Sequence, residues 1–186
     1  MRRRALLVLG AGALAALGGC AAPRLAPTPQ PASVELAGRL SLVSGVAEAQ
    51  KALYGGFRLV LQGQDAGEFE VFSPLGQMLA RAQWSPGQAS LDYGRQRQHY
   101  ASFDAMTRAA LGVALPQAAL QDWVRGKPAA DLPAQDLPGG AFVQLGWTVR
   151  PVWRDGRLAL LQAQRDGADP AQLRMVIDAA SGAAAR

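Results

Sequence analysis

Apolar and polar residues alternate with a period of two over most of this chain, and this pattern restricts the folds open to it. In the first such run, Val34 and Leu36 alternate with Glu35. Successive side chains of a strand point to opposite faces, so each run predicts a strand with one buried face. The alternation recurs over residues 57–61, 68–71, 78–84, 89–93, 95–100, 145–153, 157–165 and 172–178. The chain is therefore predicted to be mainly β.

Short segments rich in Gly, Pro and Asp separate these runs, among them residues 63–67, 85–87, 155–156 and 166–169. Such segments are typical of the tight turns of β-hairpins. Many short antiparallel strands joined by hairpins indicate a barrel or a strongly curved sheet.

One region breaks the two-residue period. Phe103, Met106 and Ala110 fall at helical spacing, with Ser102 as a candidate N-cap and Gly112 just past the last turn. A serine N-cap and a glycine after the C-terminus are the usual start and stop of a helix. The sequence therefore predicts a short helix between these two residues.

A second helix is expected from Pro116 at its first position, through Trp123, to Gly126. Two short helices inserted into a run of hairpins predict a lid or plug over one opening of the sheet, at about residues 102–126. Residues 127–140 contain three prolines and are expected to form an irregular connection back to the sheet.

Cys20, the single cysteine, follows an N-terminal segment typical of bacterial lipoproteins. Arginines at positions 2–4 precede an apolar run over residues 5–17, and two glycines precede the thiol. The run is far shorter than the roughly 20 residues that span a bilayer. We expect residues 1–19 to be a cleaved signal peptide and Cys20 to be a lipid anchor; a secretory signal with an incidental cysteine is the alternative. The uncharged Ala21 favours the outer membrane of a Gram-negative cell.

The rest of the chain is expected to be one tethered domain. Residues 20–33 carry the anchor and four prolines, which indicate a semi-rigid tether, and the domain is predicted at residues 34–180. Loss of the signal peptide leaves 16 basic and 14 acidic residues, so the net charge falls from +5 to +2. That balance argues against nucleic-acid binding. With one cysteine there is no internal disulfide, so packing must supply the stability.

A search for catalytic chemistry finds little. His99 is the single histidine, and the chain has no Gly-x-Ser-x-Gly elbow, no metal-ligand spacing and no glycine-rich phosphate loop. We therefore predict neither an enzyme, nor a metal site, nor a cofactor, and His99 is interpreted as a partly solvated strand residue. Arg95 and Arg97 share a strand face, which is either simply solvated or contacts an acidic partner or lipid headgroups.

The segment from Ser73 through Pro74 and Leu75 to Gly76 fits a β-turn, with Leu75 at the tip of a hairpin. Leucine is unusual at such a tip. It either folds back onto a neighbouring strand or enters a bilayer, where its burial is worth roughly 1.5–3 kcal/mol.

Several segments together resemble the LolB family of outer-membrane lipoprotein receptors. They lie in the family's order and are spread over about residues 33–178: GRLS at 38–41, SPLGQMLA at 73–80, LG at 111–112, LP at 115–116, LQDWVRGKP at 120–128 and GW at 146–147. The resemblance implies an incomplete antiparallel β-barrel whose short helical lid covers an apolar cavity.

The resemblance also implies a function. A LolB-like receptor takes lipoproteins from the periplasmic carrier LolA, shelters their acyl chains and inserts them into the inner leaflet of the outer membrane, as a monomer. Its membrane insertion loop falls on Pro74, Leu75 and Gly76. Such shelter is needed because exposing one acyl chain to water costs on the order of 12 kcal/mol.

Large apolar side chains are expected to line the cavity, although each could equally pack into an ordinary core. The candidates are Phe57, Leu59, Phe69, Val71, Met78, Trp84, Trp123 and Trp147. Two other classes remain open: a lipoprotein hydrolase, which the missing nucleophile disfavours, and an assembly lipoprotein that binds protein partners at a sheet edge and has no lipid cavity.

Overall fold

The computed structural model describes residues 33–182, which form an eleven-stranded antiparallel sheet and two α-helices. The predicted signal peptide, Cys20 and most of the tether lie outside the described residues. The strands are β1 (Ser33–Ser44), β2 (Lys51–Gln62), β3 (Ala66–Phe72), β4 (Met78–Ser85), β5 (Gln88–Tyr93), β6 (Gln96–Tyr100), β7 (Ala134–Asp136), β8 (Phe142–Gln144), β9 (Trp147–Arg154), β10 (Arg157–Arg165) and β11 (Ala171–Gly182).

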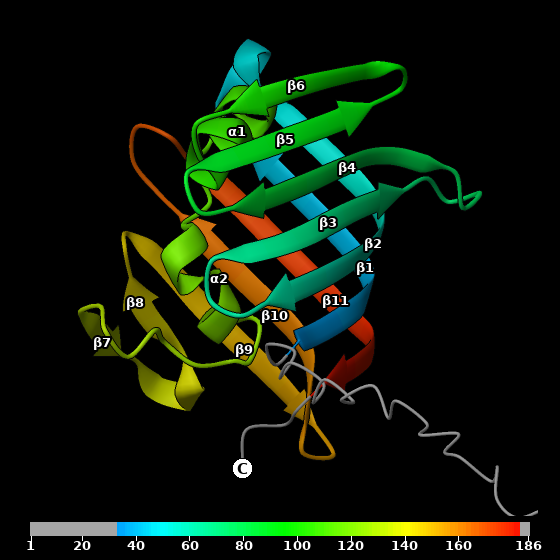
Figure 1. The fold of residues 1–186 in the computed structure, drawn as a ribbon. Helices are drawn as coiled ribbons and strands as arrows, with labels where there is room; N and C mark the ends of the chain where they lie inside the picture. The colour runs from blue at the N-terminus through cyan, green and yellow to red at the C-terminus, as the bar shows by residue number, and fades with distance from the viewer. Residues whose placement is uncertain (1–32, 183–186) are drawn as a thin grey trace, which may run out of the picture. The chain divides into compact units, whose positions relative to one another are not determined.

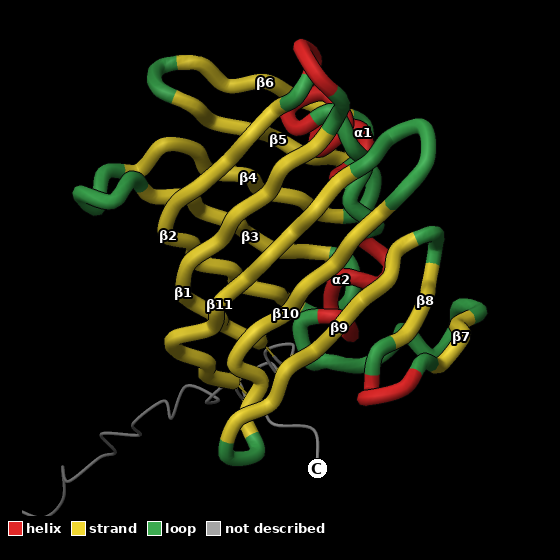
Figure 2. The backbone as a smooth tube through the Cα atoms, turned by 180° about the vertical axis from the view of Figure 1, so that it is seen from behind, coloured by secondary structure: helices red, strands yellow, loops and turns green. Residues whose placement is uncertain are grey.

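The strand order is β6-β5-β4-β3-β2-β1-β11-β10-β9-β8-β7. The first and last strands are neighbours, because β1 pairs with β11 along Val34–Ser44. The outermost strands β6 and β7 do not pair with each other, so the barrel is incomplete. Figures 1 and 2 show the sheet curling around the helices, which lie on its concave side. The predicted fold class, a curved antiparallel sheet with a helical lid, is confirmed.

Helix α1 (Phe103–Leu111) starts and stops where its capping residues predict. The Ser102 side chain accepts a hydrogen bond from the Ala105 N–H, at 3.1 Å. Gly112 ends the helix in the left-handed conformation, with φ of 76°. Such a conformation suits glycine because it has no Cβ.

Helix α2 (Gln117–Trp123) is shorter than the predicted segment. Pro116 is extended and precedes the helix, rather than forming its first turn. Together, α1 and α2 are called the lid below. No helix among residues 33–182 is long and apolar enough to cross a membrane.

Two short strands were not predicted. Residues 127–140, expected to be irregular, contain β7 and a 3-10 turn, η2 (Pro138–Gly140), while a second such turn, η1 (Ala47–Ala49), precedes β2. β7 pairs with β8, just ahead of the predicted 145–153 strand. Leu145 was expected at the start of that strand, but it lies in the turn between β8 and β9, with φ of 52°.

The hydrophobic core joins the concave face of the sheet to the lid. Trp84 of β4 packs on Phe103 of α1, with ring centroids 4.5 Å apart. Trp123 of α2 packs against Trp147 of β9, at 6.2 Å. The lid is therefore held to both halves of the curved sheet by aromatic contacts.

Candidate functional site

The loop between β3 and β4 carries the most exposed large apolar side chain among the described residues, Leu75, at 87%. Figure 1 shows this loop projecting beyond the sheet. The loop is ordered by hydrogen bonds: the Gly76 N–H donates to the Ser73 carbonyl, and the Ser73 hydroxyl accepts from the N–H groups of Leu75 and Gln77. The predicted turn is present, and its leucine does not fold back onto a neighbouring strand.

The start of β4 extends this apolar surface. Met78 is 47% exposed and Leu79 is 44% exposed. Met78 was expected to line the interior, but a register shift between Val71 and Phe72 leaves it at the rim of the sheet, beside the projecting loop.

The other seven predicted cavity residues lie in the interior. Phe69 is partly buried and stacks on Phe57, with ring centroids 5.8 Å apart. The remaining six are buried in the core between the lid and the sheet: Phe57, Leu59, Val71, Trp84, Trp123 and Trp147. With the lid seated on the sheet, these side chains pack against one another.

Polar groups of the sheet hold the C-terminal end of α1. The Lys51 ammonium donates hydrogen bonds to the carbonyls of Ala109 and Ala110, at 3.1 and 3.2 Å, and the Ser44 hydroxyl donates to the carbonyl of Leu111. Helix ends carry unpaired carbonyls and partial negative charge, so a lysine there is stabilising. One end of the lid is thus attached to β1 and β2.

Gln144 of β8 holds the other end. Its side chain is 1% exposed, and its Oε1 accepts from the Trp123 indole N–H and from the Ala129 N–H, both at 2.9 Å. Its Nε2 donates to the carbonyls of Ala129 and Leu132, both at 3.0 Å. The sequence gives no sign of this role, since a single glutamine between apolar residues carries no motif.

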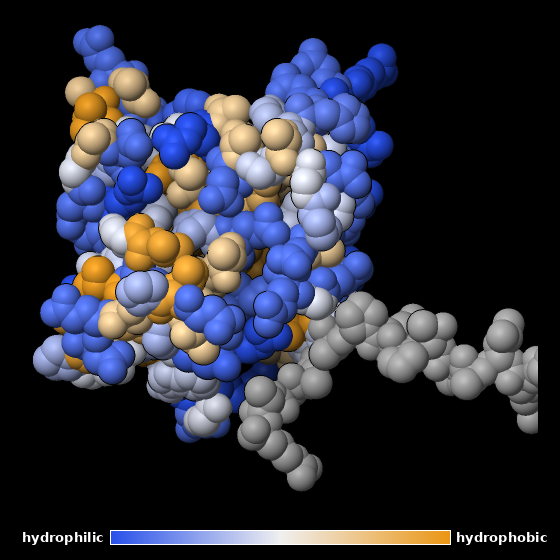
Figure 3. Space-filling view, turned by 60° about the vertical axis from the view of Figure 1, so that its left-hand side comes forward, coloured by the Kyte–Doolittle hydropathy of each residue, from blue (hydrophilic) through white to orange (hydrophobic). Residues whose placement is uncertain are grey.

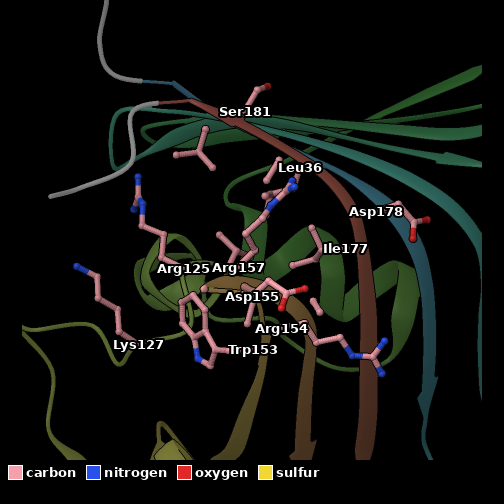
Figure 4. A pocket seen from close by; sticks show the side chains of 16 residues that line it. Leu36, Arg125, Lys127, Trp153, Arg154, Asp155, Arg157, Ile177, Asp178 and Ser181 are labelled. Atoms are coloured by element: carbon pink, nitrogen blue, oxygen red, sulfur yellow. The ribbon is translucent and has the colours of Figure 1, made fainter.

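A groove of about 700 Å³ opens where α2 ends. Its walls come from β1, from β11 and from the hairpin between β9 and β10. The floor is apolar, including Leu36, Val124 and Ile177. The charged side chains of the lining are mainly basic, with Arg125, Lys127, Arg154 and Arg157 against Asp155 and Asp178, as Figure 4 shows. None of the eight predicted cavity residues lines this groove.

The open side of the curved sheet is mixed in character. Figure 3 shows apolar side chains gathered near the middle of this face, surrounded by polar ones. Among the described residues, no group of three or more His, Cys, Asp or Glu side chains gathers as a metal site would require. His99 is exposed on β6, and the neighbouring Arg97 is paired with Asp92, Nη2 to Oδ2 at 2.6 Å.

Fold and site together define a class of protein: an open antiparallel barrel with a two-helix lid over an apolar concave face and an apolar turn that projects from its wall. The family model described as "Outer membrane lipoprotein LolB" matches residues 32–178. The chain therefore belongs to the LolB family of outer-membrane lipoproteins, as its motifs predicted.

Curated relatives named "Outer-membrane lipoprotein LolB" agree with this assignment. The protein of Cupriavidus necator is 35% identical, over 95% of this chain and 96% of its own length. That of Thiobacillus denitrificans is 36% identical, over 80% of this chain and 82% of its own length. That of Bordetella petrii is 33% identical, over 76% of this chain and 75% of its own length.

Proposed function

We propose that this protein is the outer-membrane receptor that accepts lipoproteins from the carrier LolA and inserts their acyl chains into the inner leaflet of the outer membrane. Cys20 is the proposed lipid anchor. The exposed Leu75 carries the proposal, because hydrogen bonds order a projecting turn that holds this leucine 87% exposed, where entry of the loop into a bilayer would bury it. Its transfer into a bilayer releases roughly 1.5–3 kcal/mol.

The interface between the lid and the sheet is the proposed shelter for acyl chains. It is lined by Phe57, Leu59, Phe69, Val71, Trp84, Trp123 and Trp147, and a hydrocarbon chain needs apolar contacts of this kind rather than specific polar partners. Because these side chains pack together when the lid is seated, acyl chains enter by displacing the lid. The contacts of α1 and α2 with the sheet are then replaced by contacts with cargo.

No reaction is needed for the transfer. If the carrier, the receptor and the bilayer bind the acyl chains with increasing affinity, the gradient in free energy gives the direction. This fits a protein that carries no nucleophile motif in its sequence. We infer that it acts as a transport protein and not as an enzyme.

The test is a two-step transfer assay with an acylated lipoprotein bound to the carrier. We expect Leu75→Glu to accept cargo from the carrier normally and to deliver it to liposomes at least about tenfold more slowly, because a charge at the tip opposes entry into the bilayer. Leu145→Glu is the matched control, since Leu145 is an exposed leucine in another turn. Equal loss of both steps in Leu75→Glu, or slow delivery by Leu145→Glu, contradicts the proposal.

A further inference from the structure

The groove beside α2 has both apolar and charged side chains in its lining, whereas the proposed acyl-chain shelter is lined by apolar side chains. The floor of the groove is apolar, while its charged lining has four basic side chains, three of them the guanidinium groups of Arg125, Arg154 and Arg157, against the two carboxylates Asp155 and Asp178. None of these three arginines forms an ion pair with a carboxylate among residues 33–182. Arg125 donates one Nη1 group to the oxygens of Gln121 and keeps its other donors for a ligand. An apolar surface edged by arginines that have no carboxylate partner is complementary to a molecule that has both a hydrocarbon chain and an anionic group.

The hairpin that forms one wall places like charges opposite each other. Arg154 and Arg157 are directly paired across the turn at Asp155 and Gly156. Like charges in facing positions of an antiparallel pair are destabilising. Figure 4 shows the two side chains extending in different directions. An anion bound beside Arg157 would partly offset the cost of the facing like charges.

The same hairpin exposes an aromatic ring. Trp153 is 52% exposed, and its indole lies so close to Gly126 that a Cβ there would approach within 2.5 Å of the ring. Tryptophan is enriched at the boundary between lipid headgroups and acyl chains, because its ring is apolar and its N–H can still form a hydrogen bond. Figure 4 shows the side chains of Arg125 and Arg157 extending toward the sheet above Trp153.

The position of the groove in the chain also favours a membrane. Val34, one residue after the start of β1, lines it. Ser33 is the thirteenth residue after Cys20, and a chain of that length can reach at most roughly 45 Å. An anchor at Cys20 would therefore keep this end of the sheet within that distance of the bilayer surface.

From these observations we infer that the groove binds one anionic phospholipid of the anchoring membrane, with its phosphate between Arg125 and Arg157 and one acyl chain along the floor. This contact is separate from the Leu75 loop, because no residue from 37 to 123 lines the groove. The bound phospholipid would fix the orientation of the barrel on the bilayer, whether or not cargo is present.

The test uses the lipidated protein in nanodiscs that contain a phosphatidylglycerol with a photoreactive acyl chain. Cross-links are expected in the peptide that holds residues 152–158. Arg125→Gln combined with Arg157→Gln should reduce them about tenfold, as expected for loss of charge-assisted hydrogen bonds. The control is Arg150→Gln with Arg174→Gln, which removes the same charge at exposed arginines outside the groove. Arg157→Gln alone, at an exposed hairpin residue, should still reduce the cross-links at least about threefold.

Four results overturn the inference. They are equal cross-linking by photoreactive phosphatidylcholine, competition by free glycerol phosphate, equal loss in the control pair, and absence of cross-links in the hairpin peptide. Competition by glycerol phosphate would indicate a site for a free phosphate instead of a lipid. The cross-linking experiment contains no cargo, so the two proposals are tested separately. A negative cross-linking result would not contradict the proposed transfer function, and a negative transfer assay would not contradict the lipid site.

Discussion

At the scale of single residues, Gln144 shows how a buried polar group positions the lid. All of its hydrogen-bonding groups are used, and three of its four partners belong to the backbone of residues 129–132. The fourth is the indole N–H of Trp123, at the end of α2. One side chain therefore ties the lid and the connection that follows it to β8. The sequence could not reveal this, because the partners are 12 to 21 residues away and meet Gln144 only after the sheet has curled.

Replacing Gln144 with Ala should destabilise the protein by about 3 kcal/mol, because the Trp123 N–H and the backbone groups of Ala129 are left buried without partners. Urea unfolding measures the change. Gln83→Ala is the control, since Gln83 is exposed and makes one side-chain hydrogen bond, to Glu68. We expect the control to cost under about 1 kcal/mol. A loss of less than 1 kcal/mol in Gln144→Ala would show that the four hydrogen bonds do not hold the lid.

At the scale of strands, side chains of alternating charge face one another across five neighbouring strands. The series runs Arg58, Glu70, Arg81, Asp92 and Arg97, one from each of β2 to β6, and every consecutive pair is in register. Opposite charges in facing positions favour this register over a shifted one. The hydrogen bond from Arg97 holds the pKa of Asp92 below its usual value, and the hydrogen bond to Glu70 raises the pKa of Arg81.

The contribution of Asp92 should depend on pH. Its pKa is lowered in the folded state, so its stabilising effect is full above the ordinary aspartate pKa of about 4 and is lost as the pH falls through the lowered value. We expect the protein to be more stable than its Asp92→Asn variant at pH 7, and this difference to vanish in acid. Urea midpoints from pH 7 to pH 2.5 measure it. The control is Asp136→Asn, at an exposed aspartate of β7, whose urea midpoint should match that of the unmodified protein at each pH. If the midpoint difference for Asp92→Asn does not change with pH, the ion-pair explanation is wrong.

Helices and strands could be predicted from the sequence where the residues that determine them are close together in the chain. The caps of α1 and the long alternating strands are visible in the sequence because each depends on neighbours within a few residues. The strands β7 and β8 have three residues each, too few to show a period, and Leu145 takes a turn conformation that leucine rarely adopts. The groove was not predicted either, because its walls come from both ends of the domain and meet only through the pairing of β1 with β11.

At the scale of the whole molecule, the structure is an incomplete barrel whose concave face is covered by the two-helix lid. The sheet forms a continuous curved wall, whereas the lid is two short helices joined to it by the aromatic contacts at Trp84 and Trp123 and by a few hydrogen bonds. Short helices have little stability of their own, so the lid is the part that can move at the lowest cost. Entry of an acyl chain should then be limited by how often the lid leaves the sheet.

Weakening the attachment of the lid should therefore speed the uptake of lipid. Lys51→Met removes the two hydrogen bonds to the end of α1, worth about 1 kcal/mol together, so we expect a fluorescent fatty acid to bind roughly fivefold faster. Stopped-flow fluorescence measures the rate, and Arg150→Met, which removes an exposed positive charge on β9, should leave it unchanged. Equal rates in all three proteins would mean that the lid does not limit entry. If none of them takes up fatty acid saturably, the interior is a solid core, and an assembly lipoprotein without a lipid cavity becomes the better explanation.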